Sequence, residues 1–123
     1  MPKTVLSVDD SKSIRDMIGF TLRPKGYDVI GAGDGVEGLE ALAANEVSLV
    51  VCDLNMPNMN GIEMIRKARE DRRFDGLPIV MLTTEAQKEK MMEAKEAGAT
   101  GWLVKPFDEE KLVAVVNKMI GGA

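Results

Sequence analysis

Short apolar runs alternate with longer stretches of mixed apolar and polar residues along the whole chain. The third and fourth runs have almost no polar residue at alternate positions, which is typical of parallel strands covered on both faces. The alternation repeats five times, and it therefore predicts five buried strands. These strands are predicted at Thr4–Val8, Tyr27–Ala32, Leu49–Cys52, Ile79–Leu82 and Trp102–Val104.

The stretches between the runs have the periodicity of amphipathic helices. Apolar residues recur at positions i, i+3, i+4 and i+7 in the stretch 14–22, and similar spacings occur at 36–43, 62–68 and 112–119. The stretch 85–97 is rich in helix-forming residues but carries only a thin apolar stripe. Five strand–helix repeats predict an α/β fold, a single (βα)5 doubly wound parallel sheet with helices on both faces.

Residues typical of helix ends flank these stretches. A serine or aspartate at an N-cap accepts a hydrogen bond from a free backbone N–H group, and a glycine at a C-cap adopts the left-handed conformation. These preferences predict N-caps at Ser11 and Asp108 and C-caps at Gly26 and Gly98.

Length and charge limit the classes of protein to consider. We expect the 123 residues to form a single domain, 1–123, with a flexible tail at 121–123. The net charge of −4 gives no overall attraction to nucleic acid or to anionic membranes. No apolar run approaches the roughly 20 residues of a membrane-spanning helix. The single cysteine cannot form an internal disulfide, so we expect a cytoplasmic protein that binds neither nucleic acid nor membrane.

The absence of histidine is the sharpest compositional fact. It excludes a Ser-His-Asp triad, a histidine-bound metal and a phosphohistidine within these residues. Any chemistry must therefore come from carboxylates, hydroxyls, lysines or a bound hard cation.

Polar residues follow four of the five predicted strands. The carboxyl ends of parallel strands meet at one edge of the sheet, where ligands bind, so these residues are expected to lie together. Each one alone has an ordinary explanation as a turn, cap or surface residue, but their joint occurrence favours a site. They are Asp9 and Asp10 after the first strand, Asp53 after the third, Thr83 and Thr84 after the fourth, and Lys105 and Pro106 after the fifth.

Three carboxylates beside one lysine leave an excess of negative charge. Two carboxylates about 4 Å apart repel by roughly 4 kcal/mol at an effective dielectric constant near 20, so at least one carboxyl pKa should be raised. A hard divalent cation would balance the charge, and Mg²⁺ is predicted, with Mn²⁺ as the alternative. The predicted ligands are Asp9, Asp10, Asp53 and the main-chain carbonyl of Asn55.

Such a site suits phosphoryl transfer to a carboxylate. Asp53 would attack phosphorus as a nucleophile and form an acyl phosphate. The cation and Lys105 would neutralise charge on the phosphoryl oxygens, and Thr83 would donate a hydrogen bond to one of them.

At these residues the chain resembles the receiver domain of two-component response regulators. The resemblance rests on Asp9-Asp10, Asp53, Thr83 and Lys105-Pro106, with Met56-Pro57-x-Met59-x-Gly61 between them, and it covers essentially the whole chain. It implies a flavodoxin-like, CheY-like fold with strand order 2-1-3-4-5.

The resemblance also implies a role for each residue. Asp53 is the phosphoacceptor and Asp10 the main carboxylate ligand of Mg²⁺, while Asp9 acts through water or hydrogen bonds. Thr83 and Lys105 contact the phosphoryl group. In the list of further roles, the Asn55 carbonyl completes the ligand set, Thr84 and Glu85 neighbour the phosphate, Thr83 and Trp102 form the switch, and the peptide before Pro106 is cis.

Within the family the chain resembles the stand-alone chemotaxis type. Asn55, Glu85 and the segment Gly101–Phe107 match that branch. Two positions depart from the family pattern. Thr84 stands where Ala, Gly or Ser is usual, which bears on access to the phosphoryl group, and Trp102 replaces the usual Tyr or Phe of the switch.

The expected function is a signalling protein, not an enzyme with a separate substrate. The resemblance implies that a partner histidine kinase donates the phosphoryl group from a phosphohistidine. Phosphorylation would switch a surface that binds a downstream protein, such as the flagellar motor switch, and the chain is expected to be a monomer.

Three other functions are compatible with parts of the sequence. A receiver can serve as a phosphate sink or as an intermediate in a relay. The Asp53-Leu54-Asn55 segment is also similar to the D-x-D loop of aspartyl-phosphate phosphatases. The Gly33–Gly38 segment matches the G-x-G-x-x-G pattern of dinucleotide-binding domains, although Asp34 and Glu37 would place negative charge against a pyrophosphate.

Overall fold

In the computed structural model, which describes residues 2–121, five parallel strands form one sheet in the order β2-β1-β3-β4-β5. This order and the alternation of strands with helices are those predicted. The strands are β1 (Thr4–Val8), β2 (Asp28–Ala32), β3 (Leu49–Asp53), β4 (Ile79–Thr84) and β5 (Gly101–Lys105).

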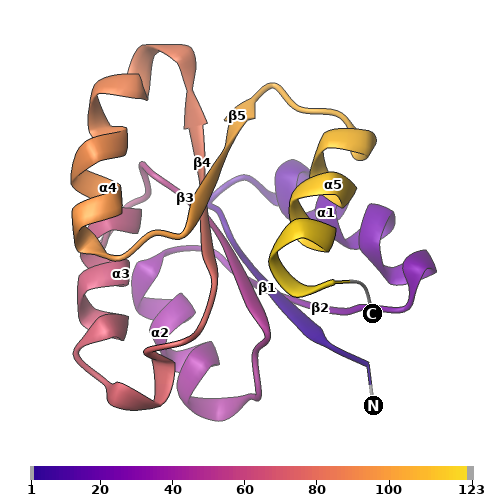
Figure 1. Cartoon of the computed structure of the whole chain (residues 1–123), viewed down its shortest axis with the longest axis horizontal. Helices are drawn as coiled ribbons and strands as arrows, with labels where there is room; N and C mark the ends of the chain where they lie inside the picture. The colour runs from indigo at the N-terminus through magenta and orange to yellow at the C-terminus, as the bar shows by residue number, and fades with distance from the viewer. Residues whose placement is uncertain (1, 122–123) are drawn as a thin grey trace.

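Helices cover both faces of the sheet. Figure 1 shows α2, α3 and α4 on one side of the strands and α1 and α5 on the other. The helices are α1 (Lys12–Leu22), α2 (Gly35–Ala44), α3 (Gly61–Arg69), α4 (Met91–Ala97) and α5 (Glu109–Ile120), with short 3-10 helices η1 (Arg23–Lys25), η2 (Arg72–Phe74) and η3 (Glu85–Lys90).

The sheet separates two apolar layers. Alternate residues of each strand point to opposite faces, so that Leu6 and Val50 pack toward α2, α3 and α4, while Val5 and Val51 pack toward α1 and α5. All four side chains are fully buried. Both layers together fix the position of the strand ends, where the predicted site lies.

The predicted helix caps are largely confirmed. The Ser11 hydroxyl accepts the Ile14 N–H, and the Asp108 carboxylate accepts the Lys111 N–H at 2.9 Å. Gly98 ends α4 with a φ of 120°. Gly26 also adopts a left-handed conformation, but it follows η1 because α1 continues directly into that 3-10 turn.

Two expectations about element boundaries are wrong. The predicted strands end too early, because β3 includes Asp53 and β4 extends to Thr84. The stretch 85–97 is not one helix but η3 followed by α4. None of the residues of η3 is buried, and α4 buries only Ala94, so little apolar packing favours a regular α-helix there.

The chain end and the helices bear on two further expectations. Gly121, the first residue of the predicted tail, caps α5 by donating its N–H to the Asn117 carbonyl at 2.8 Å. Residues 122–123 of that tail lie outside the described residues. In the described part of the chain, no helix has both the length and the apolar character that crossing a membrane requires.

The first residue of α3 packs against the end of β3. A Cβ at Gly61 would overlap the Asp53 carbonyl oxygen and lie 2.9 Å from the Met81 Cε. We therefore expect Gly61→Ala to lower the free energy of unfolding in urea by about 1–3 kcal/mol, the usual cost of overpacking. Gly76→Ala is the control, because a Cβ there has no atom within 4 Å. It should cost nothing or stabilise by up to about 1 kcal/mol, and equal losses in both variants would contradict the close approach.

Candidate phosphoryl-acceptor site

Three charged side chains meet at the carboxyl edge of the sheet. Asp9 follows β1 directly, Asp53 ends β3 and Lys105 ends β5. Strand β4 lies between β3 and β5, and the long lysine side chain reaches past it. Its Nζ lies 3.1 Å from Asp9 Oδ2 and 3.1 Å from Asp53 Oδ1. The structure thus brings together three residues that are far apart in the sequence.

Both carboxylates in this contact are buried. Asp9 has no exposed surface and Asp53 is 7% exposed. The second oxygen of Asp9, Oδ1, accepts the Ser11 N–H at 2.9 Å, and the Arg15 guanidinium donates to the Asp9 main-chain carbonyl. Asp9 is therefore held at both ends. Arg15 is absent from the predicted site, because helical periodicity does not indicate that its side chain folds back onto the strand end.

Asp10 is exposed and completes an acidic cluster with Asp9 and Asp53. One carboxylate oxygen from each residue lies within 4.8 Å of the other two. This spacing and the all-oxygen donor set fit a hard divalent cation such as Mg²⁺. The single ammonium of Lys105 leaves part of the negative charge uncompensated.

The electrostatics of the cluster appear in two shifted pKa values. Burial raises the pKa of the Asp53 carboxyl, the Asp9 charge raises it further, and Lys105 offsets only part of this increase. Burial opposes the charge on Lys105, but the Asp53 and Asp9 carboxylates outweigh it, and the lysine pKa is raised. The ammonium therefore stays charged at neutral pH. The repulsion expected from the sequence is present, but burial is the larger cause.

The two threonines at the end of β4 differ in their surroundings. Thr83 is 1% exposed, and its hydroxyl has no hydrogen-bond partner among the described residues. Leaving a buried polar group unpaired costs about 1–3 kcal/mol, so this hydroxyl is suited to a ligand oxygen. Thr84 is half-buried, pairs with Lys105 across the sheet, and donates its N–H to Gln87 Oε1 at 2.8 Å.

The remaining predicted site residues lie around this centre. Asn55 is exposed in the loop after β3. Glu85 is exposed and pairs with Lys88 at 2.8 Å. Trp102 is 44% exposed on β5, and the Lys105–Pro106 peptide is cis.

The glycine-rich turn before α2 is occupied by its own acids. Asp34 Oδ1 accepts the Glu37 N–H at 2.9 Å, and Glu37 Oε1 accepts the Gly33 N–H at 3.1 Å. In a dinucleotide-binding domain, N–H groups of this turn bind the pyrophosphate. Here carboxylates take their place, which argues against a dinucleotide site at Gly33–Gly38.

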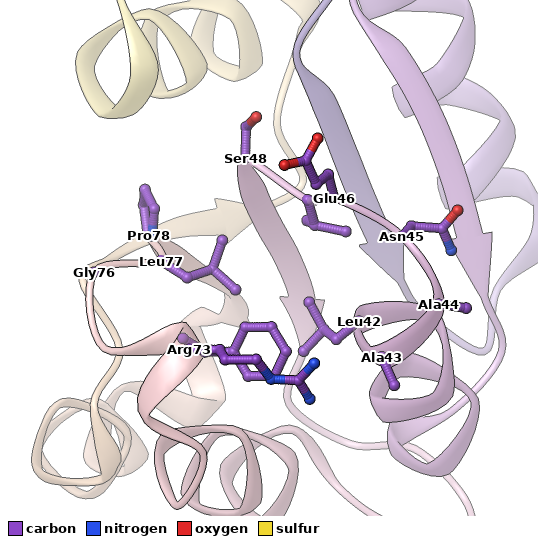
Figure 2. A pocket seen from close by; sticks show the side chains of 12 residues that line it. Leu42, Ala43, Ala44, Asn45, Glu46, Ser48, Arg73, Gly76, Leu77 and Pro78 are labelled. Atoms are coloured by element: carbon purple, nitrogen blue, oxygen red, sulfur yellow. The ribbon is translucent and has the colours of Figure 1, made fainter.

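A large cleft lies at the opposite edge of the sheet. Figure 2 shows this cleft of about 700 Å³ beside the amino ends of β3 and β4, between Leu42, Ser48 and Leu77. The Arg73 guanidinium stacks 5.2 Å from the centre of the Phe74 ring at its border. Its lining contains none of the predicted site residues. A smaller and mostly apolar cleft of about 330 Å³ adjoins the acidic site, lined by Ile14, Met17, Thr84, Lys105, Pro106 and Phe107.

A doubly wound sheet with acids gathered at its carboxyl edge places the chain in the flavodoxin-like class of α/β proteins. Within that class, the chain belongs to the response regulator receiver domain family, whose pattern matches residues 5–117. This confirms the resemblance on which the site was predicted. Receiver domains of this kind are signalling proteins.

Similar proteins cover nearly the whole chain. Chemotaxis protein CheY1 of Helicobacter pylori is 41% identical over 119 residues, which are 95% of this chain and 96% of that protein. The chemotaxis protein CheY homolog of Campylobacter jejuni is 39% identical over 119 residues, covering 95% and 92%. The structure of chemotaxis response regulator CheY4 of Vibrio cholerae matches with a TM-score of 0.92 and 43% identity, covering 97% of this chain and 99% of that one.

The raised pKa of Asp53 predicts a pH-dependent effect on stability. Because the folded pKa lies above the unfolded one, the stability contributed by Asp53 is present at low pH and lost as the pH rises through the folded pKa. In EDTA at pH 7, Asp53→Asn should therefore raise the melting temperature by a few degrees, since 1 kcal/mol corresponds to roughly 4 °C in such a domain. The difference should shrink near pH 4.

Asp75→Asn is the control for this measurement, because Asp75 is an exposed aspartate far along the chain from the site. Surface substitutions of this kind usually change stability by less than about 0.5 kcal/mol. A lower melting temperature for Asp53→Asn than for the wild type at pH 7 would contradict the electrostatic description.

Proposed function

We propose that the chain is a chemotaxis response regulator that accepts a phosphoryl group on Asp53 from the phosphohistidine of a partner histidine kinase. One observation carries the proposal: the buried Asp53 carboxylate lies 3.1 Å from Lys105 Nζ and shares an acidic cluster with Asp9 and Asp10. Relatives named as chemotaxis proteins support the biological role. None of the 123 residues is a histidine, so the donor lies outside them.

The proposed step is a displacement at phosphorus. A carboxylate oxygen of Asp53 forms the new P–O bond, and the P–N bond of the phosphohistidine breaks, with its electron pair going to the imidazole. The product is an acyl phosphate. Phosphoryl transfer depends mainly on positioning and on stabilising charge. Lys105, which already contacts Asp53, neutralises charge on a phosphoryl oxygen, and the unpartnered Thr83 hydroxyl donates a hydrogen bond to another.

Mg²⁺ is the proposed cofactor, with Mn²⁺ as a substitute. Asp9, Asp10, Asp53 and the main-chain carbonyl of Asn55 would hold it. The oxygen-only donors and the excess negative charge of the cluster support this ligand set. When bound, the cation supplies positive charge against the phosphoryl oxygens.

Phosphorylation is proposed to shift the chain between two conformations. Thr83 moves toward the phosphoryl group, and Trp102, which is 44% exposed on β5, changes its packing. Glu85 and Thr84 flank the phosphoryl group. The altered surface binds a downstream protein, and a flagellar motor protein is the proposed target. The chain acts as a cytoplasmic monomer that catalyses only its own phosphorylation and dephosphorylation.

The alternative functions fit the site less well. A phosphate sink or relay intermediate would use the same residues and would differ only in having no output partner. An aspartyl-phosphate phosphatase needs a second acid that donates a proton. The residue in that place is Asn55, whose amide is not such an acid.

The phosphoacceptor role can be tested with a small phosphate donor. Incubation with acetyl phosphate and Mg²⁺ should add one phosphoryl group to the intact chain, detected by mass spectrometry. Asp53→Asn should abolish the addition because it removes the nucleophile, and EDTA should abolish it by removing the cation. Asp75→Asn, which changes an exposed aspartate, should be labelled like the wild type. A phosphoryl group retained by Asp53→Asn would place the acceptor elsewhere.

A further inference from the structure

Asp34 is a buried carboxylate outside the acidic cluster. It is 7% exposed, and the other buried carboxylates among the described residues are Asp9 and Asp53. Asp34 is the N-cap of α2, where its Oδ1 accepts the Glu37 N–H at 2.9 Å. A cap needs only one acceptor, and Ser11 performs the same task at α1 with a hydroxyl. The cap therefore does not account for the second carboxylate oxygen.

The second oxygen of Asp34 binds a loop that is distant in the sequence. Its Oδ2 accepts a hydrogen bond from Asn58 Nδ2 at 2.7 Å. Asn58 has a φ of 67°, and among the described residues it is the one non-glycine with a positive φ. Residues other than glycine seldom adopt this conformation without a local interaction that stabilises it. The hydrogen bond from its side chain to Asp34 is such an interaction.

A second hydrogen bond joins the same two segments. The Gly35 N–H donates to the Met59 carbonyl at 3.2 Å. A Cβ at Gly35 would lie 2.8 Å from that carbonyl oxygen, so the two backbones approach as closely as glycine allows. The turn before α2 and the loop 54–60 are thus docked side by side, with Asp34 and Asn58 forming the side-chain part of the contact.

The buried charge of Asp34 strengthens this contact. Among the described residues, no lysine or arginine forms a salt bridge with it, so its charge is stabilised by hydrogen bonds alone. The Glu37 N–H and then the Asn58 amide lower the pKa of Asp34, which keeps it ionised. Hydrogen bonds to an ionised acceptor are stronger than neutral ones.

The other end of this loop reaches the acidic site. Asn55, whose main-chain carbonyl is the proposed neutral metal ligand, lies two residues after Asp53. The loop is closed at its base by the Gly61 N–H, which donates to the Leu54 carbonyl at 2.9 Å. It is therefore held at its base by β3 and α3, and at its far side by Asp34. Without the contact to Asp34, only the base would restrain the segment that carries Asn55.

We propose that Asp34 is a positioning residue of the metal site, which acts through Asn58 to hold the loop 54–60 and the Asn55 carbonyl in the arrangement that binds Mg²⁺. This inference rests on the proposed function, because it concerns the cation of that site. Residues that support metal ligands from outside typically affect metal affinity by about 10–100-fold.

Two variants separate this role from helix capping. Asp34→Ser keeps an acceptor for the Glu37 N–H but removes the acceptor for Asn58. Asn58→Gly keeps the left-handed backbone but removes the amide. Each should weaken Mg²⁺ binding about tenfold in isothermal titration calorimetry. The double variant should bind no more weakly than either single one, because both remove the same contact.

Asp108→Ser is the matched control. Asp108 caps α5 through one hydrogen bond, from the Lys111 N–H at 2.9 Å, and the same substitution there breaks no contact with the loop 54–60. Its Mg²⁺ affinity should equal that of the wild type. Weakening as large as that of Asp34→Ser would show general destabilisation and would overturn the proposal.

A second measurement separates positioning from simple damage. The Mg²⁺ concentration that gives half-maximal phosphorylation by acetyl phosphate should rise about tenfold in Asp34→Ser, while the rate at saturating Mg²⁺ stays at the wild-type level. Wild-type affinity in both Asp34→Ser and Asn58→Gly would overturn the positioning role and leave the proposed function intact. Failure of the wild type to bind Mg²⁺ would overturn both.

Discussion

Lys105 places one ammonium 3.1 Å from each of two buried carboxylates, and the chemistry of the site follows from this unequal sharing. An ionised carboxylate taken out of water loses several kcal/mol of hydration, roughly, unless an opposite charge compensates it. Lys105 compensates Asp9 and Asp53 only in part, because the pKa of Asp53 remains raised. The exposed Asp10 adds further negative charge. A site in this condition binds a hard cation, and a phosphoryl group, which brings more negative charge, depends on that cation.

The sheet makes this concentration of charge sustainable. Asp53 ends a strand whose five residues are all buried, so its backbone is fixed by pairing to β1 on one side and β4 on the other. Lys105 is fixed in the same way by pairing of β5 with β4. Because these charged groups belong to rigid strands, their positions do not relax to relieve the repulsion. The loops carry the adaptable parts, and Asp34 restrains one of them through Asn58.

Much of this arrangement could be predicted from the sequence, for physical reasons. Buried parallel strands leave continuous apolar runs, and residues at their carboxyl ends must meet at one edge. Those two rules place Asp9, Asp53 and Lys105 together, and the family resemblance assigns their roles. Burial as the main cause of the Asp53 shift was not predictable, since the depth of a strand end depends on the packing of helices from both faces.

Other features leave no periodic signal in the sequence. The contact between Asp34 and Asn58 joins side chains 24 positions apart, and it depends on a left-handed backbone that an asparagine adopts only in context. The fold of Arg15 onto the Asp9 carbonyl is equally invisible to helical spacing. The division of 85–97 into η3 and α4 reflects weak apolar packing, which composition suggests only faintly.

The central claim, that the Asp53 carboxylate becomes an acyl phosphate, is tested most directly by chemical trapping. Borohydride reduces an acyl phosphate to the alcohol, so a phosphorylated aspartate becomes homoserine, which peptide mass spectrometry can locate. After treatment with acetyl phosphate and Mg²⁺, the account predicts homoserine at position 53 alone, and none when Mg²⁺ is withheld. Homoserine at Asp9 or Asp10, or a phosphoryl group that resists borohydride, would contradict it.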